Sequence, residues 1–211
     1  MALGIDIILP AFDDIRSTFN LPDSGGQERQ IITIYFIGLA IAQLFFGPLS
    51  DWFGRKPVLY IGISIYLIGA IGSALAPSFS LLMTARFVWG IGAAGSRVVA
   101  VAIIRDSFEG NRMAKAMSEI MAVFVLVPIV APALGAGIIA IFPWQGIFWF
   151  CVIWAIAIGV WSLRLSETLN PAYRTKVNLK TTLRVYRRVC TTRIPATYTV
   201  ASIFLQAIFV L

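Results

Sequence analysis

Charged side chains lie inside apolar stretches of the sequence: Asp6, Arg86 and Arg97, with Glu119 as a further candidate. A charge at the centre of a membrane helix costs about 2.5–3.5 kcal/mol to insert, so it is rarely kept without a use. Arg86 and Arg97 fall within about 20° of one helix face and roughly 16 Å apart along its axis. Asp6 and Arg86 lie at similar depth, which permits an ion pair. Such a pair can be purely structural, but intramembrane ionisable residues usually serve pathways or proton relays, and we favour that interpretation.

A second cluster of charge separates two apolar runs of helical length. The segment 47–57 reads GPLSDWFGRKP and carries Asp51, Arg55 and Lys56. A link this short between two such runs predicts a tight hairpin between two membrane helices.

The composition explains why these elements must be membrane helices. Of the 211 residues, 59% are hydrophobic and only 13% are charged, and the mean hydropathy is +0.86. Charged residues are about a quarter of a soluble chain, so lipid is the expected solvent here. The fold class predicted is an all-α integral membrane protein.

The apolar runs predict six membrane helices and the start of a seventh. The first, 2–12, is expected to be the outer half of a helix that closes near Pro10, followed by a polar loop over 13–28. Further helices are expected at 29–49, 57–75, 79–104, 113–141 and 146–163, with the fifth broken by Pro128 and Pro132. Residues 1–165 would then form a transmembrane bundle, 166–195 a basic linker, and 196–211 the start of the seventh helix. Both terminal runs are short, which favours a fragment or a shortened chain.

Several function classes have no support in the sequence. Without histidine there are no histidine metal sites or Ser-His-Asp triads, and Cys151 and Cys190 suggest neither a disulfide framework nor a zinc site. No glycine-rich phosphate loop is followed by Lys and Ser/Thr, so no ATP motor is expected. We therefore predict no enzyme, no metal and no cofactor, with transport driven by an ion gradient or the substrate's own gradient. The net charge of +7 could suggest nucleic acid, but the cations flank apolar runs instead.

The distribution of cations predicts the orientation. Of 17 Lys and Arg, 13 lie in the segments 51–57, 105–115 and 164–195, and the other face has only Arg16 and Arg29. The positive-inside bias predicts that those three segments face the cytoplasm. We expect a multi-pass protein of the bacterial inner membrane.

Tryptophans 144, 149 and 161 lie near helix ends, where interfacial anchoring is expected. Within the linker, four residues are spaced so that they share one face of a helix, and the basic residues lie outside that face: Leu179, Leu183, Tyr186 and Cys190. This pattern predicts an amphipathic helix on the inner leaflet.

Together these stretches resemble the major facilitator superfamily, and within it the drug:proton antiporters of the Bcr/CflA type. The signature between helices two and three, G-x-L-x-D-x-x-G-R-K, is matched by Gly47, Leu49, Ser50, Asp51, Gly54, Arg55 and Lys56. Leu82, Arg86, Gly90, Gly92 and Ala93 are similar to the fourth-helix motif, whose arginine is tied to proton coupling. The segment around Pro128, Ala131, Pro132 and Gly135 resembles the antiporter motif G-P-x-x-G-G, with alanine at 131 and 136. The segment from Asp6 through Pro10 resembles the acidic first-helix segment of multidrug members.

The resemblance implies the N-terminal six-helix bundle of a twelve-helix fold, with the other bundle as its missing partner. Alternating access would move the two bundles about a midplane cavity. Asp51 would latch onto a helix start in the other bundle, and Arg55, Arg105 and Asp106 would form the accompanying charge network. Asp6, Arg86 and Arg97 would couple protons to a small-molecule substrate, and Tyr35 and Gln43 would line the cavity.

Two alternatives stay open. A proton-coupled uptake carrier for a metabolite would share the gate signature but have a more polar cavity and no antiporter motif. A non-transporting membrane partner made by the truncated chain is the other.

Overall fold

The computed structural model describes residues 3–22 and 26–169, together with the single positions 174, 184, 188, 191, 192 and 197. The chain divides into two compact units, Met1–Arg174 and Thr175–Leu211, and the account below concerns the first. The amphipathic helix predicted in the linker and the predicted start of a seventh helix lie outside the continuously described residues.

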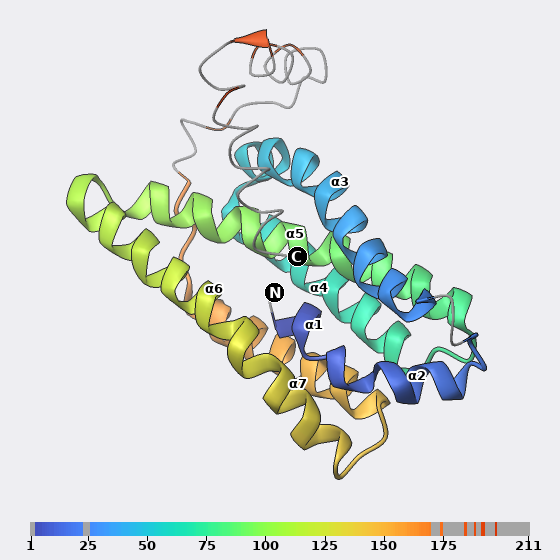
Figure 1. Ribbon diagram of the computed structural model, residues 1–211. Coiled ribbons are helices and arrows are strands. Elements are labelled where there is room, and N and C mark those ends of the chain that lie inside the picture. Colours follow the sequence, from blue (N-terminus) through green and yellow to red (C-terminus); the bar gives the residue numbers. More distant parts are fainter. Residues whose placement is uncertain are drawn as a thin grey trace. The chain divides into compact units, whose positions relative to one another are not determined.

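Five helices of the described chain are long and apolar enough to cross a membrane (Figure 1). They are α3 (Gln30–Phe53), α4 (Arg55–Ala74), α5 (Phe79–Ser107), α6 (Gly110–Ile139) and α7 (Gln145–Trp161). Shorter helical segments precede or join them: α1 (Leu3–Asp6), η1 (Leu9–Ala11), α2 (Phe12–Thr18), η2 (Gln27–Arg29) and η3 (Ser162–Arg164). The predicted all-α, multi-pass membrane architecture is confirmed.

The helix α5 packs tightly between α3 and α4, as Figure 1 shows. Glycines bring the backbones into direct contact at these crossings. A Cβ atom on Gly90 would lie 2.1 Å from the carbonyl oxygen of Tyr35 in α3, and one on Gly92 would lie 2.1 Å from the backbone nitrogen of Tyr66 in α4. Small residues permit such an approach, so these three helices form one interlocked unit.

The first segment differs from the prediction of a helix that closes near Pro10. Pro10 stands at the start of η1, and the chain continues directly into α2, which ends at Thr18. Proline lacks an N–H group but fits the first turn of a helical segment, so it breaks the helix and starts another. The predicted loop over 13–28 is therefore partly wrong. Asp13 and Asp14 in the first turn of α2 and Arg16 in its last turn complement the helix dipole.

The predicted hairpin after residue 49 is shorter than expected. The helix α3 continues through Pro48 to Phe53, and α4 begins at Arg55. Only Gly54 separates them, with φ 104° and ψ 162°. This φ is accessible to glycine and strained for other residues, so one residue reverses the chain and Ser50 and Asp51 belong to the last turns of α3.

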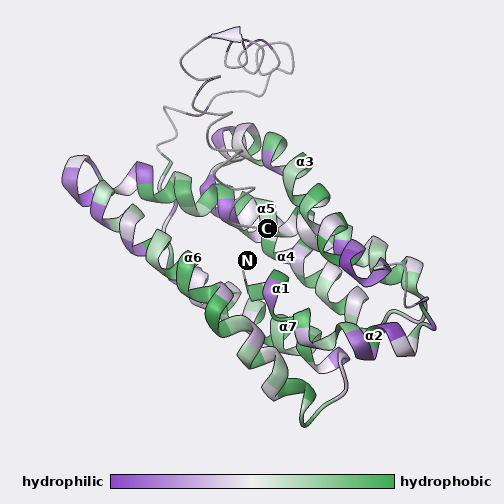
Figure 2. Ribbon diagram, in the orientation of Figure 1, coloured by the Kyte–Doolittle hydropathy of each residue, from purple (hydrophilic) through white to green (hydrophobic). Residues whose placement is uncertain are grey.

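The helix α6 remains continuous across Pro128 and Pro132, whereas the sequence predicted a break. Its apolar face is largely uncovered, with Val123, Ile129 and Val130 exposed. Figure 2 shows apolar residues along much of α6 and α7. Trp144, predicted to anchor at the interface, is instead buried, and its indole donates a hydrogen bond of 3.0 Å to the Thr18 hydroxyl.

Candidate functional site

Arg55 is the centre of a charge network at the end of the bundle that carries Gly54, called here the Gly54 end. Arg55 lies in the first turn of α4, and its side chain is only 10% exposed. Nη1 donates to the Asp51 carboxylate and, at 2.7 Å, to the Ser50 hydroxyl, both in α3. Nε donates at 2.8 Å to the carboxylate of Asp106 in α5. One guanidinium therefore ties together the ends of α3, α4 and α5.

Glu167, which follows η3, closes this network from another direction. One oxygen of its carboxylate accepts the backbone N–H of Arg55 at 2.9 Å, and the other accepts that of Lys56 at 3.1 Å. Partial burial alone would raise the pKa of Glu167, but backbone hydrogen bonds from Leu169, Arg55 and Lys56 outweigh it and lower the pKa. The carboxylate also fills the space beside Gly54, because a Cβ there would lie 2.6 Å from its Oε2. Glu167 therefore caps α4 as an anion at a helix N-terminus.

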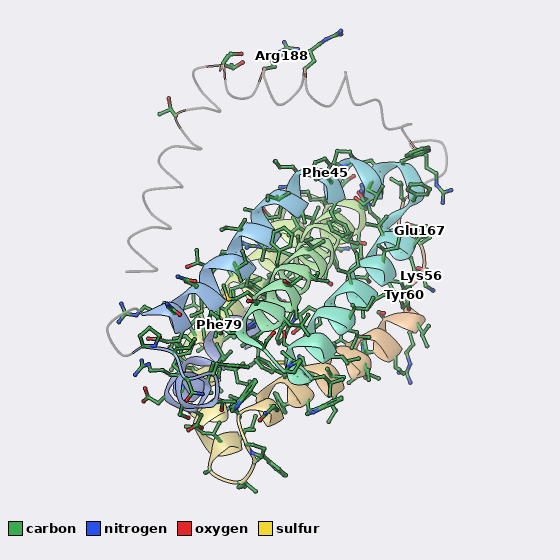
Figure 3. The ribbon with its side chains drawn as sticks, turned by 90° about the vertical axis from the view of Figure 1, so that its right-hand side faces the viewer. Phe45, Lys56, Tyr60, Phe79, Glu167 and Arg188 are labelled. Atoms are coloured by element: carbon green, nitrogen blue, oxygen red, sulfur yellow. The ribbon has the colours of Figure 1, made fainter. Side chains whose placement is uncertain are left out.

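The start of α4 also contacts the end of the last described membrane helix. Lys56 Nζ donates at 3.2 Å to the carbonyl of Leu163. The Ser162 hydroxyl donates at 3.1 Å to the hydroxyl of Tyr60. Figure 3 shows Lys56 and Glu167 close together, away from Phe79 at the start of α5. Every residue predicted for the gate signature lies at the Gly54 end.

A cavity of about 400 Å³ opens beside the network. Two helix faces and Arg55 form its walls, and the lining residues are Gln43, Gly47, Ser50, Asp51, Arg55, Arg97, Val98, Val101, Ala102, Arg105 and Asp106. The structure thus brings Gln43 and Arg97, two predicted cavity or coupling residues, to the same space as the gate residues. Tyr35, the other residue predicted to line a cavity, is not among the lining residues and is buried elsewhere.

Arg86 lies in an aromatic cage within the bundle. The guanidinium carbon is 4.7 Å from the ring centroid of Trp89, 5.2 Å from that of Phe148 and 5.9 Å from that of Tyr35. Only 1% of Arg86 is exposed, and the ring faces stabilise its charge. Nη1 donates to the carbonyl of Gly4 at 2.9 Å. Three polar atoms of the cage have no hydrogen-bond partner among the described residues: Arg86 Nε, Tyr35 Oη and Trp89 Nε1.

The structure does not show the ion pair between Asp6 and Arg86 that similar depth permitted. Arg86 instead donates to the carbonyl of Gly4, two residues before Asp6. Asp6 is the last residue of α1 and makes no ion pair within the described residues. The break of the first segment explains this, because Asp6 is the last residue before the turn at Ile7 and Ile8. Asp6 is therefore a half-buried carboxylate that Arg86 does not neutralise.

The segment predicted as an antiporter motif packs against the broken first segment. Ala131 is fully buried, and a Cβ on Gly135 would lie 2.1 Å from the carbonyl oxygen of Ile7. Pro128 is exposed, and Pro132 is partly buried. Glycine at 135 thus lets α6 approach the backbone beside Asp6.

Sequence reasoning missed Glu167 as part of the site. Its two main partners are backbone N–H groups 111 and 112 residues away, and backbone groups carry no residue type for a motif to detect. The available signal was a lone carboxylate in a basic segment that follows a membrane helix.

Apolar crossing helices, joined at one end by a buried arginine network, define a multi-pass helical membrane protein. The Major Facilitator Superfamily profile matches residues 1–211. "Multidrug resistance protein MdtL" of Shigella dysenteriae serotype 1 (strain Sd197) is 36% identical over 169 residues, 80% of this chain and 43% of that protein. The protein of the same name from Escherichia coli O81 (strain ED1a) is 35% identical over the same length. The crystal structure of the human organic anion transporter MFSD10 (TETRAN) matches with a TM-score of 0.65 at 20% identity, over 92% of this chain and 54% of that chain.

The chain belongs to the Major Facilitator Superfamily, as its motifs predicted. That membership puts it among transport proteins rather than enzymes. The likeness to the human structure concerns the fold alone. The chain spans 43% of the length of the curated relatives it matches.

Proposed function

We propose that this chain is part of a secondary transporter that exports drugs or other small lipophilic molecules in exchange for protons, of the Bcr/CflA type. The observation that carries the proposal is the 36% identity over 169 residues to a protein named for multidrug resistance. The unneutralised carboxylate of Asp6 beside the antiporter segment supports proton coupling, because an acidic group at membrane depth can bind and release a proton. The Gly54 end faces the cytoplasm of a bacterial inner membrane in this proposal.

The Arg55 network would serve as one side of a gate. Asp51 is half exposed, so one of its oxygens is available to a helix start in a second bundle. That bundle would cover the exposed face of α6 and the open side of the cavity. Rocking of the two bundles would break and remake the contact of Asp51 during each cycle.

Protonation of Asp6 would change the charge beside the Arg86 cage. Gly135 places α6 directly against the backbone of Ile7, so a shift of the first segment on protonation would move α6 as well. Substrate and proton would then compete through the position of one short segment, without a direct Asp6–Arg86 pair.

The test uses the whole protein that carries this sequence, expressed in cells that lack their own drug efflux. Ethidium-loaded cells should lose the dye when a proton gradient is present and keep it when the gradient is collapsed. Asp6→Asn should abolish gradient-driven efflux while the protein stays in the membrane at the same level. Full efflux by the Asn variant would contradict the proton role, and gradient-driven accumulation would favour an uptake carrier.

The gate is tested separately with Asp51→Asn. The variant should lower the turnover of ethidium efflux by about tenfold, and its apparent affinity for the dye should change little, because Asp51 acts on the conformational step. A variant that loses affinity at unchanged turnover would argue against a gate.

A further inference from the structure

The cavity at the Gly54 end has an uneven charge balance. Both of its carboxylates, Asp51 and Asp106, hydrogen-bond the single guanidinium of Arg55. The other two lining cations, Arg97 and Arg105, form no ion pair with any described residue. Each carboxylate is therefore paired with Arg55, whereas the guanidinium groups of Arg97 and Arg105 have no acidic partner among the described residues and remain available to a ligand.

Arg97 is placed to face such a ligand. Its side chain is exposed, and its guanidinium carbon lies 5.5 Å from the ring centroid of Phe124 in α6. The contact orients the guanidinium and leaves its N–H groups free to donate. Because Arg97 lies within the membrane-crossing part of α5, its charge is unfavourable there unless an anion or water accompanies it.

The wall between the two arginines is apolar. Val98, Val101 and Ala102 line the cavity between Arg97 and Arg105, on the same face of α5. The two arginines are eight residues apart in the sequence, so their Cα atoms lie about 12 Å apart along the helix. A ligand that satisfies this wall has an anionic group for a guanidinium and an apolar body for the valines. The volume of about 400 Å³ falls in the range of small-molecule sites.

We propose that this cavity binds lipophilic organic anions, with Arg97 as the residue that pairs with their carboxylate, sulfonate or phosphate group. This rests on the proposed export function and adds one class to its substrates, beside the cations and neutral molecules that Asp6 would attract. Arg105 adds a second positive group to the lining of the cavity.

The test measures binding directly on the whole protein that carries this sequence, reconstituted in nanodiscs of phosphatidylcholine. Fluorescein, an organic anion, and rhodamine 123, a cation of similar shape, are titrated separately and followed by fluorescence anisotropy. Fluorescein should bind at least about tenfold more tightly than rhodamine 123. Arg97→Gln should weaken fluorescein binding by about tenfold or more, the range for a hydrogen bond to a charged group. Arg97→Lys should retain part of the affinity.

Arg112→Gln is the matched control, because Arg112 is an exposed cation at the same end and does not line the cavity. It should bind fluorescein as the unchanged chain does. Unchanged binding by Arg97→Gln, an equal loss in Arg112→Gln, or equal affinity for the two dyes would overturn the proposal. Circular dichroism checks that the Arg97 variants keep their helix content.

Nanodiscs that contain phosphatidylglycerol separate the two sources of an anionic group. Suppression of fluorescein binding by this lipid would assign the Arg97 site to a lipid headgroup, and unchanged binding would assign it to soluble anions. Export is a separate readout. Ethidium efflux without fluorescein binding would refute the anion site and leave the transporter intact, whereas fluorescein binding without ethidium efflux would refute the export function alone.

Discussion

At the scale of single residues, Arg55 shows why an arginine is needed at the start of α4. Its planar guanidinium presents N–H groups in several directions at once, and here Nε and Nη1 reach Asp106 in α5 and Asp51 in α3. A lysine has one ammonium group at the tip of its chain and cannot reproduce both directions. The predicted pairing of Arg55 with the acidic residues of its surroundings thus depends on geometry as well as charge.

Glu167 gives a residue-scale prediction. Glu167→Gln keeps the length of the side chain but removes the charge that caps α4. We expect the free energy of unfolding to fall by about 0.5–2 kcal/mol at pH 7, the usual range for a lost helix cap. Thermal unfolding in detergent, followed by intrinsic fluorescence, measures the change. Glu109→Gln is the control, because Glu109 is an exposed carboxylate whose side chain caps nothing.

The pH dependence of that difference follows from the lowered pKa of Glu167. A carboxyl group with a folded-state pKa below its ordinary value of 4.5 stabilises the protein above that value. The stabilisation is lost as the pH falls through the folded-state pKa, since the proton then binds in both states. The unchanged chain should therefore converge in stability with Glu167→Gln below pH 4.5. A difference that stays constant at all pH values would exclude the charge as its cause.

At the scale of elements, the glycines of α5 decide how the long helices pack. Gly90→Ala would place a methyl group 2.1 Å from a backbone oxygen of α3, and neither backbone can move without separating the helices. We expect a loss of about 3 kcal/mol or more, at the upper end of the overpacking range. The yield of folded protein extracted in mild detergent and its melting temperature would both report it.

Gly47→Ala is the control within the same bundle. No atom lies within 4 Å of a Cβ on Gly47, so the methyl group has space, and stability should stay within about 0.5 kcal/mol or rise slightly. Equal effects of the two substitutions would show that α3 and α5 are not in direct contact at Gly90.

The elements also show what the sequence could predict. The helices predicted at 57–75 and 79–104 are found at Arg55–Ala74 and Phe79–Ser107, because hydropathy and local stop signals determine them. The helical continuation beyond Pro10 was missed, because a proline stops one helix and starts another with the same local signal. The sequence predicted a network of Arg55, Arg105 and Asp106. The structure pairs Arg55 with Asp106 and also with Asp51, whereas Arg105 forms no ion pair among the described residues. The Glu167 cap and the backbone contact of Arg86 join groups that no spacing rule connects.

At the scale of the whole molecule, the two ends of the bundle have different chemistry. The Gly54 end holds Arg55 in a network with Asp51, Asp106 and Glu167, next to the cavity that Arg105 also lines. The other end is held by aromatic packing of Phe19 with Phe79 and Trp144, and by a 2.8 Å ion pair between Arg16 and Glu28. The excess of cations counted in the sequence predicts that the Gly54 end faces the cytoplasm.

That direction can be tested by chemical labelling in spheroplasts. Glu109→Cys places a thiol at the Gly54 end, between α5 and α6, and Ser80→Cys places one at the start of α5, at the other end. Both positions are exposed, and a Cys190→Ser background leaves only the buried Cys151 as a native thiol. A membrane-impermeant maleimide should label Ser80→Cys in intact spheroplasts, and Glu109→Cys only after the membrane is permeabilised.

The reverse pattern would place the Gly54 end outside the cell. The Arg55 network would then close the opposite side of the transport pathway, because a gate occludes the side on which it lies. The cavity with Arg97 would in that case open outward and collect anions from outside. The labelling experiment therefore determines both the topology and the side from which the cavity takes its ligand.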